Sequence, residues 1–188
     1  MHEFKNTRNL VITALMAAIA ILLGWTHWGF IPWFGGVSLT IMYIPVVIAA
    51  LIVGPVSGLI VGLIFGIFSM IQAGVAPTGP TDVWFTNPVL SVLPRLFIGP
   101  LAWAVGRALK PWPALALPLA GAAGSLTNTI LVLGMIGLLG YLPWAALGAI
   151  VIANGLPEML ISAFITTAVV AAYWHIPLGN RKGANLKD

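Results

Sequence analysis

Residues 87–110, NPVLSVLPRLFIGPLAWAVGRALK, place one charged side chain, Arg95, inside an apolar run that is long enough to cross a lipid bilayer, with Arg107 and Lys110 at its end. A charge at that depth costs about 3 to 15 kcal/mol, so we expect the guanidinium to face protein or a water-filled cavity rather than lipid. Pro94 and Pro100 flank the arginine and interrupt the helical hydrogen bonds, which frees carbonyl groups to point into such a cavity. Two interpretations follow: Arg95 pairs with a group on another helix, or it receives an anionic or carbonyl group of a ligand.

The rest of the chain shares this apolar character. Of its 188 residues, 60% are hydrophobic and only 6% are charged, whereas about a quarter of the residues of a soluble domain are charged. We therefore predict an all-α integral membrane protein that forms a single membrane-embedded domain over residues 1–188. The first apolar run follows Lys5 and Arg8 as a signal peptide would, but it lacks a clear cleavage site, so we expect a retained first helix.

Glycines, prolines and polar clusters divide the chain into six predicted transmembrane helices. These span residues 8–24, 39–54, 55–74, 88–109, 112–140 and 144–175. Basic residues precede the first helix and follow the fourth and the sixth, so that six helices place all of them on one side of the membrane. The positive-inside rule makes this the cytoplasmic side, and it predicts that both termini and a basic tail at about 177–188 are cytoplasmic. The loops predicted to face outside are 25–38, 75–87 and 140–143.

Four polar side chains stand out within the last three predicted helices: Arg95, Asn128, Asn154 and Glu158. Asn154 and Glu158 are four residues apart and share a helix face. The cost of exposing polar groups to lipid brings such faces together in the bundle. One interpretation is an Arg95–Glu158 ion pair whose remaining donors and acceptors are satisfied by the two amides. The other is a small-molecule pocket open to the outside, in which Arg95 or an amide holds the polar end of a ligand.

Aromatic side chains gather in two of the predicted outer loops. Loop 25–38, WTHWGFIPWFGGVS, contains several rings between glycines, and loop 75–87 contains Trp84. Such rings are typical of an interfacial belt, but a glycine-hinged loop of rings is also suited to close over a ligand. We therefore include Trp33 and Trp84 among the candidate ligand contacts.

Small residues line one face of two predicted helices. Ala14 and Ala18 in the first helix allow another helix to approach closely, either within the bundle or from a partner protein. The third helix carries a longer series at four-residue spacing, for which we favour internal packing: Gly54, Gly58, Gly62 and Gly66.

The sequence lacks the patterns of an enzyme. Its three histidines are far apart, it has no cysteine, and no cluster of carboxylates is present to hold a catalytic metal. We predict no catalytic residue, metal or cofactor. A Walker motif is also missing, so any energy from ATP must come from a partner. The basic residues lie at a few positions rather than along one face, which argues against binding to nucleic acid.

Taken in order, these features resemble the substrate-binding S component of energy-coupling factor (ECF) vitamin transporters. The resemblance covers essentially the whole chain. It rests on Ala14-x-x-x-Ala18, Val53-Gly54-Pro55, Leu93-Pro94-Arg95-Leu96, Thr127-Asn128-Thr129 and Asn154-Gly155-x-x-Glu158.

The resemblance implies a bundle in the prokaryotic plasma membrane that binds a vitamin or vitamin precursor beneath loops 25–38 and 75–87. It also implies docking, through the alanine face, to a membrane coupling subunit driven by two ATPases. The pattern of the last three helices is most similar to the pantothenate branch, while pyridoxine, hydroxymethylpyrimidine and riboflavin are other candidate ligands. The alternative from a different class is an assembly or scaffold protein whose polar residues only hold the bundle together.

Overall fold

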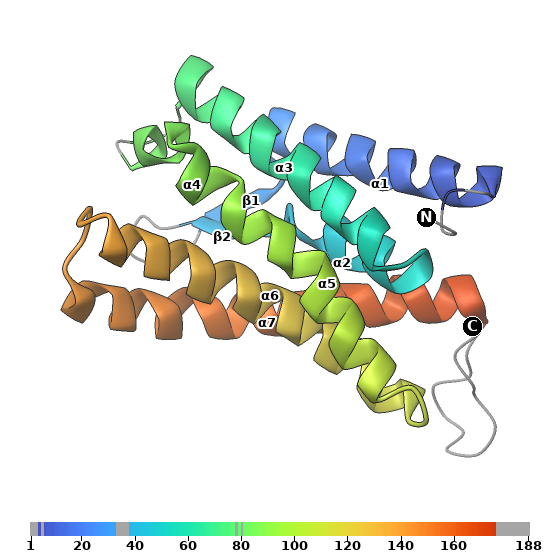
Figure 1. Ribbon diagram of the computed structural model, residues 1–188. Coiled ribbons are helices and arrows are strands. Elements are labelled where there is room, and N and C mark those ends of the chain that lie inside the picture. The colour runs from blue at the N-terminus through green and yellow to red at the C-terminus, as the bar shows by residue number, and fades with distance from the viewer. Residues whose placement is uncertain (1–3, 5, 33–37, 78, 80, 176–188) are drawn as a thin grey trace.

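The computed structural model of the chain describes residues 4, 6–32, 38–77, 79 and 81–175, and it is built mainly from helices (Figure 1). The helices are α1 (Thr7–Trp25), α2 (Ile44–Ile52), α3 (Pro55–Val75), α4 (Pro88–Ser91), α5 (Leu93–Ala108), α6 (Pro113–Leu138) and α7 (Trp144–Trp174). A 3-10 helix, η3 (Asp82–Thr86), precedes α4, and the strands β1 (Phe30–Pro32) and β2 (Ser38–Thr40) form an antiparallel ribbon.

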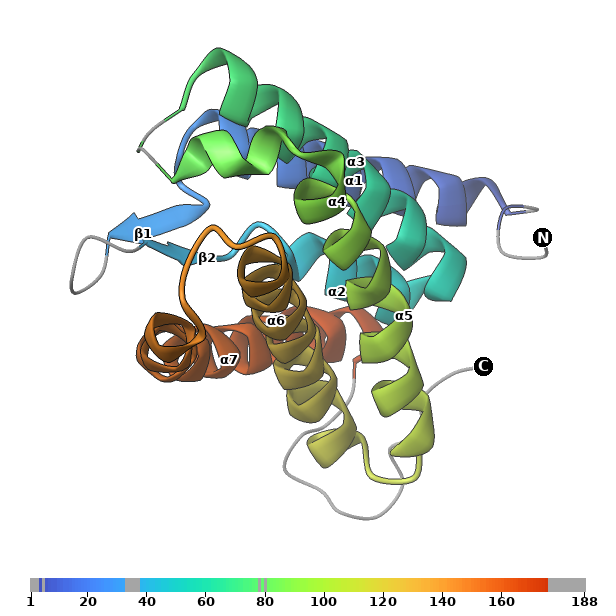
Figure 2. The same cartoon turned by 60° about the vertical axis from the view of Figure 1, so that its left-hand side comes forward.

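Five helical spans are long and apolar enough to cross a membrane among the described residues: α1, α3, α4 with α5, α6 and α7. Asn87 begins the third of these, because its side chain accepts a hydrogen bond from the Val89 amide and Pro88 occupies the first helical turn. Figures 1 and 2 show α1 and α3 on one side of the bundle and α6 and α7 on the other, with α2 and α5 between them.

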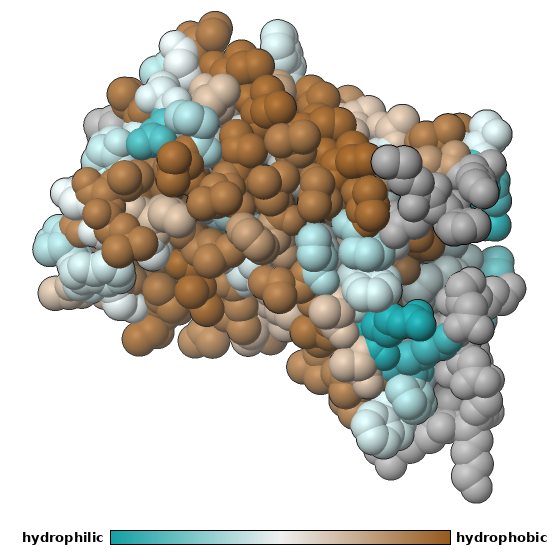
Figure 3. All heavy atoms as spheres, viewed as in Figure 1, coloured by the Kyte–Doolittle hydropathy of each residue, from teal (hydrophilic) through white to brown (hydrophobic). Residues whose placement is uncertain are grey.

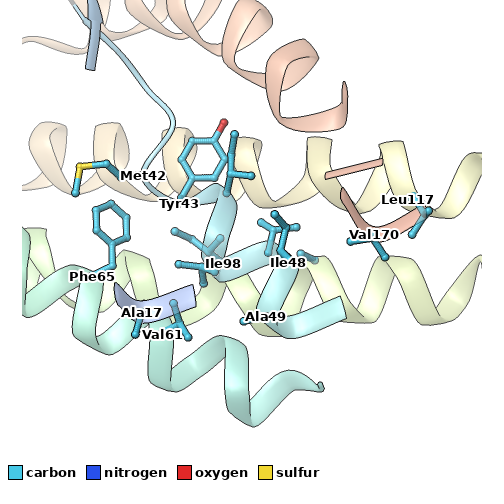
Figure 4. Packing of buried hydrophobic residues seen from close by; sticks show 14 of the residues in the cluster. Ala17, Met42, Tyr43, Ile48, Ala49, Val61, Phe65, Ile98, Leu117 and Val170 are labelled. Carbon is cyan, nitrogen blue, oxygen red and sulfur yellow. The ribbon is translucent and has the colours of Figure 1, made fainter. Parts of the chain in front are cut away.

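The second predicted helix differs from the expectation. We expected a membrane-spanning helix over residues 39–54, but α2 has only nine residues and rises about 14 Å, roughly half of the apolar core of a bilayer. The β ribbon replaces its predicted first turn. The apolar sequence of α2 reflects burial inside the protein, because every residue from Ile44 to Ala50 is buried. Figure 4 shows side chains of this segment packed among Val61, Phe65 and Ile98.

Glycines set the close approach of α3 to its neighbours. A Cβ atom on Gly58 would lie 2.9 Å from the Gly99 Cα atom of α5, and one on Gly66 would lie 2.8 Å from the Val92 Cα atom. Gly54 has a φ of 146°, which allows the sharp turn from α2 into α3. The glycine series therefore serves internal packing, as predicted, and it holds the segment around Arg95 against α3.

The beginning of α1 and the end of α7 lie at the same end of the bundle (Figure 1). Residues from the α2–α3 turn and the end of α5 line a common cavity with them. α1 runs from this end of the bundle to the other, and the chain then returns through the ribbon and the short α2 to the start of α3. Because α2 provides this return, the beginning of α1 and the end of α7 lie at the same end although only five spans of the described chain are long. The cytoplasmic location of this end stays a prediction.

Hydrophobic side chains dominate the outer surface. Figure 3 shows them over much of the face formed by α3, α5 and α6, with hydrophilic residues gathered toward the two ends. Large exposed side chains on the outer faces include Leu22, Ile130, Leu160 and Phe164. Such a surface is suited to contact with lipid.

Candidate ligand-binding site

A cavity of about 550 Å³ opens at the end of the bundle where α3 ends and α7 begins. It lies between α3, α5, α6 and α7, and residues of β2 and η3 border it. This volume falls within the usual range for small-molecule sites. Among the residues predicted from the sequence, those that line the cavity are Arg95, Asn128, Asn154, Glu158 and Trp84.

Arg95 is held by the helix break that precedes it. Pro94 has no N–H to donate to the carbonyl of Leu90, four residues earlier, and Arg95 Nη1 donates to that oxygen instead at 2.6 Å. The guanidinium lies over the rings of Phe65 and Phe85, at 5.4 and 5.1 Å from their centroids. These contacts fix the position of the group beside the cavity.

The charge of Arg95 has no counterion in the described part of the chain. Arg95 is 5% exposed, its Nε atom has no hydrogen-bond partner, and no carboxylate of the described residues forms an ion pair with it. The Arg95–Glu158 pair, one of the two interpretations of the sequence, is therefore not formed here. A buried cation without a counterion is costly. An anionic ligand group in the cavity would remove that cost.

Glu158 instead ties the β ribbon to α7. Its Oε1 accepts a hydrogen bond from the Thr40 amide at 2.6 Å, and its Oε2 accepts one from the Thr129 hydroxyl at 3.3 Å. The Tyr43 hydroxyl donates to the Glu158 main-chain carbonyl at 3.2 Å. Sequence reasoning missed Thr40, because a backbone amide of β2, 118 positions away along the chain, leaves no local pattern around Glu158.

The two asparagines complete the polar wall of the cavity. Asn128 on α6 and Asn154 on α7 are both buried, and Asn128 Oδ1 has no hydrogen-bond partner. Because buried polar atoms nearly always find a partner, this oxygen favours a ligand or water that donates to it. On α6 the same face continues with apolar residues at the four-residue spacing of a helix, Val132 and Ile136, so the wall changes from polar to apolar.

Trp84 covers one side of the cavity. Its ring stacks on that of Tyr141, with centroids 5.2 Å apart and an angle of 5° between the planes. This pair joins η3 to the connection between α6 and α7. Trp25 and Trp28 are 76% and 78% exposed and do not line the cavity, as expected for an interfacial belt. Trp33, the other candidate, lies outside the described residues.

Gln72 and Ser69 are lining residues on α3 that the sequence did not single out. Gln72 Nε2 donates to the Gly24 carbonyl of α1 at 2.9 Å, which places the amide at the edge of the cavity. One sequence feature could have identified Gln72 as a candidate site residue: it is the one glutamine of the chain and lies in a mostly apolar helix.

The small residues of α1 lie on two different sides of the helix, one facing the inside of the bundle and one facing outward. Ala17 and Ala20 are buried in the bundle, whereas Ala14 and Ala18 are exposed on the outer side of α1. The exposed pair is therefore free to contact another protein or lipid.

Comparisons with known proteins find a matching family and two similar chains. Residues 8–170 match the family model described as ECF transporter, substrate-specific component. The chain is 32% identical to the pantothenic acid transporter PanT of Lactococcus lactis over 191 aligned positions, which cover 92% of this chain and 96% of that protein. It is 30% identical to the pantothenate transporter PanT of Leuconostoc mesenteroides over 138 positions, which cover 67% of this chain and 66% of that protein.

Proposed function

The chain belongs to the family of substrate-specific components of ECF transporters, and on that premise we propose that it binds pantothenate in the cavity beside Arg95. It is a multi-pass protein of the cell membrane with a role in vitamin uptake. The names of the two relatives support pantothenate as the vitamin. The observation that carries the proposal is the buried guanidinium of Arg95 with no counterion among the described residues.

The polar end of pantothenate is a carboxylate, which is the natural partner of a guanidinium. In our proposal the carboxylate accepts hydrogen bonds from Arg95, whose Nε–H group has no other acceptor in the described part of the chain. The low dielectric around a buried group strengthens this attraction, while the rings of Phe65 and Phe85 keep the guanidinium from turning away. The carboxylate then supplies the counterion that Arg95 lacks.

The remaining groups of pantothenate match the other walls of the cavity. Its two hydroxyls are donors that suit the acceptors Asn128 Oδ1 and the Glu158 carboxylate. Its amide suits Asn154, and its geminal methyl groups suit the apolar wall formed by Val132 and Ile136. Pyridoxine, hydroxymethylpyrimidine and riboflavin lack a carboxylate and would leave Arg95 without a counterion. A scaffold protein would have no use for a cavity with unpartnered polar atoms.

Transport requires partners that supply energy. Membership of the family supports a complex with a membrane coupling subunit and two ATPases, and we propose that the exposed Ala14 and Ala18 on α1 form part of the contact with the coupling subunit. Release of the vitamin on the other side of the membrane then depends on ATP hydrolysis by the partners.

The test compares pantothenate with panthenol, which carries an alcohol in place of the carboxylate. Isothermal titration of the purified protein should show pantothenate binding at least about 30-fold more tightly, because losing one partner of a buried charge pair costs about 2 kcal/mol or more. In the variant Arg95→Gln this difference should disappear. Equal affinities of the parent protein for the two compounds would refute the assignment of the carboxylate to Arg95.

A further inference from the structure

A second cavity, of about 650 Å³, lies at the end of the bundle where α1 begins and α7 ends. The beginnings of α1 and α3 and the ends of α2, α5 and α7 enclose it. It is separate from the proposed vitamin site, with which it shares no lining residue.

The charges on the walls of this second cavity are all positive in the described part of the chain. Arg8, Arg107 and Lys110 line it, and none of its described lining residues is acidic. Two of the four acids of the chain, Asp82 and Glu158, line the other cavity, and the remaining two lie outside the described residues. The cavity therefore attracts anions.

Aromatic rings hold the two arginines in place. The guanidinium of Arg8 lies 5.2 Å from the centroid of the Tyr173 ring, and that of Arg107 lies 5.6 Å from the centroid of the Trp103 ring. A guanidinium stacked on a ring keeps its N–H edges available for a planar or phosphate acceptor. The first contact joins α1 with α7, and the second lies within one turn of α5. Both arginines are exposed, and both line the cavity.

The position of the cavity favours a lipid headgroup over a soluble anion. It lies where the spans end, with the amphipathic rings of Trp103 and Trp174 in its wall, as is typical of the level of lipid headgroups. Exposed apolar side chains on the adjoining turns, Val11 on α1 and Leu101 on α5, offer a surface to acyl chains. A soluble anion would use the charges and leave this apolar surface unused.

We propose that the second cavity binds the phosphate headgroup of an anionic phospholipid, with Arg8 and Arg107 as its main donors. Basic pockets between transmembrane helices are suited to such headgroups, and each basic residue near the surface strengthens the binding. The inference concerns a site that does not depend on the identity of the vitamin.

The test measures lipid retained by the purified protein. Native mass spectrometry of protein with phosphatidylglycerol or phosphatidylcholine should show retention of the first lipid only. The double variant Arg8→Gln with Arg107→Gln should retain phosphatidylglycerol about tenfold less. The matched control, Lys182→Gln with Lys187→Gln, removes the same charge from the basic tail and should retain it like the parent.

Three results would overturn the proposal. Equal retention by the arginine variant and the parent would show that the lipid binds elsewhere. An equal loss in the tail control would indicate attraction by net charge alone. Displacement of the lipid by millimolar inorganic phosphate would identify a site for soluble anions. If the glutamine variant does not fold, Arg8→Lys with Arg107→Lys keeps the charges but lacks the planar fork, and it should still retain less lipid than the parent.

Discussion

At the scale of single residues, the site depends on a proline as much as on the arginine beside it. Pro94 withholds the backbone N–H that would otherwise donate to the Leu90 carbonyl, and the side chain of Arg95 takes its place. The flanking rings then limit the other motions of the guanidinium. A residue with no polar side chain thus determines where the charge of the site lies.

Replacing this proline should weaken ligand binding without unfolding the protein. In Pro94→Ala the new backbone N–H donates to the Leu90 carbonyl and competes with Arg95 for this acceptor. The hydrogen bond that positions the guanidinium is therefore weakened. We expect the affinity for pantothenate to fall by about fivefold, which corresponds to about 1 kcal/mol, the typical worth of one hydrogen bond. Titration calorimetry measures the affinity, and thermal unfolding without ligand should be unchanged or occur at a higher temperature.

Pro100→Ala is the matched control for this prediction. Pro100 lies inside α5, more than a turn beyond Arg95, and the hydrogen bond it interrupts does not involve Leu90. Its affinity should equal that of the parent. A comparable loss in both variants would mean that general bending of α5, rather than the Leu90 carbonyl, sets the site.

At the scale of elements, the mouth of the cavity is bordered by segments that belong to no long helix. The Glu158–Thr40 hydrogen bond attaches the β ribbon to α7, and the Trp84–Tyr141 stack attaches η3 to the α6–α7 connection. Each attachment joins parts of the chain that are distant in sequence. Such segments open at lower cost than the packed helices and are suited to admit and release a ligand.

Removing the stack should speed ligand release more than it changes capture. Trp84→Ala deletes a ring pair worth about 0.5 to 1.5 kcal/mol, and a cover of this kind acts mainly after the ligand has entered. We expect the release rate to rise about threefold to tenfold in stopped-flow measurements, with the association rate nearly constant.

Trp28→Ala provides the control for the cover, because Trp28 is exposed and does not line the cavity. Its release rate should match the parent rate. If Trp84→Ala released ligand no faster than this control, η3 would not act as a cover, and Trp33 would be the next residue to test.

At the scale of the whole molecule, our proposal requires the outer surface to contact both lipid and a partner protein. Most exposed positions carry bulky apolar side chains, while Ala14 and Ala18 leave part of α1 nearly flat. A flat helix face lets the backbone of a second helix approach closely, which is the main source of helix association in membranes. In our proposal, ligand binding and docking therefore use different surfaces of the same bundle.

Bulk on this face should block assembly and leave ligand binding intact. Ala14→Leu with Ala18→Leu adds side chains where a partner helix must approach, far from the cavity. Copurification with the coupling subunit should be lost, uptake into cells that express the complete complex should fall to background, and the affinity of the isolated protein for pantothenate should be unchanged.

An exposed alanine pair on another helix serves as the control. Ala104 and Ala108 on α5 have the same spacing, and both are exposed. Their double replacement by leucine should allow assembly and uptake. Normal uptake by the Ala14 and Ala18 variant would limit these alanines to contacts with lipid, and concentrative uptake by the protein alone in liposomes without ATPases would contradict a transport role that depends on partners.

Sequence reasoning alone found the long helices and predicted that Arg95, Asn128, Asn154 and Glu158 are buried in the bundle. Both follow from local composition: apolar runs of about 20 residues, breaks at glycine and proline, and the cost of a charge in lipid. The prediction of a membrane-spanning helix over residues 39–54 was wrong. A short helix that is buried on all sides is as apolar as a transmembrane helix, so composition does not distinguish the two.

The contacts of these polar residues became known only from the folded structure. Arg95 and Glu158 have the charges of an ion pair, but Glu158 receives donors from Thr40 and Thr129 while Arg95 lies between two rings. Sequence reasoning cannot choose between such arrangements, because each depends on distances between segments far apart in the chain. The periodicity of hydrophobic residues indicates which side of a helix is buried. Which residues that side contacts depends on how all the helices pack together.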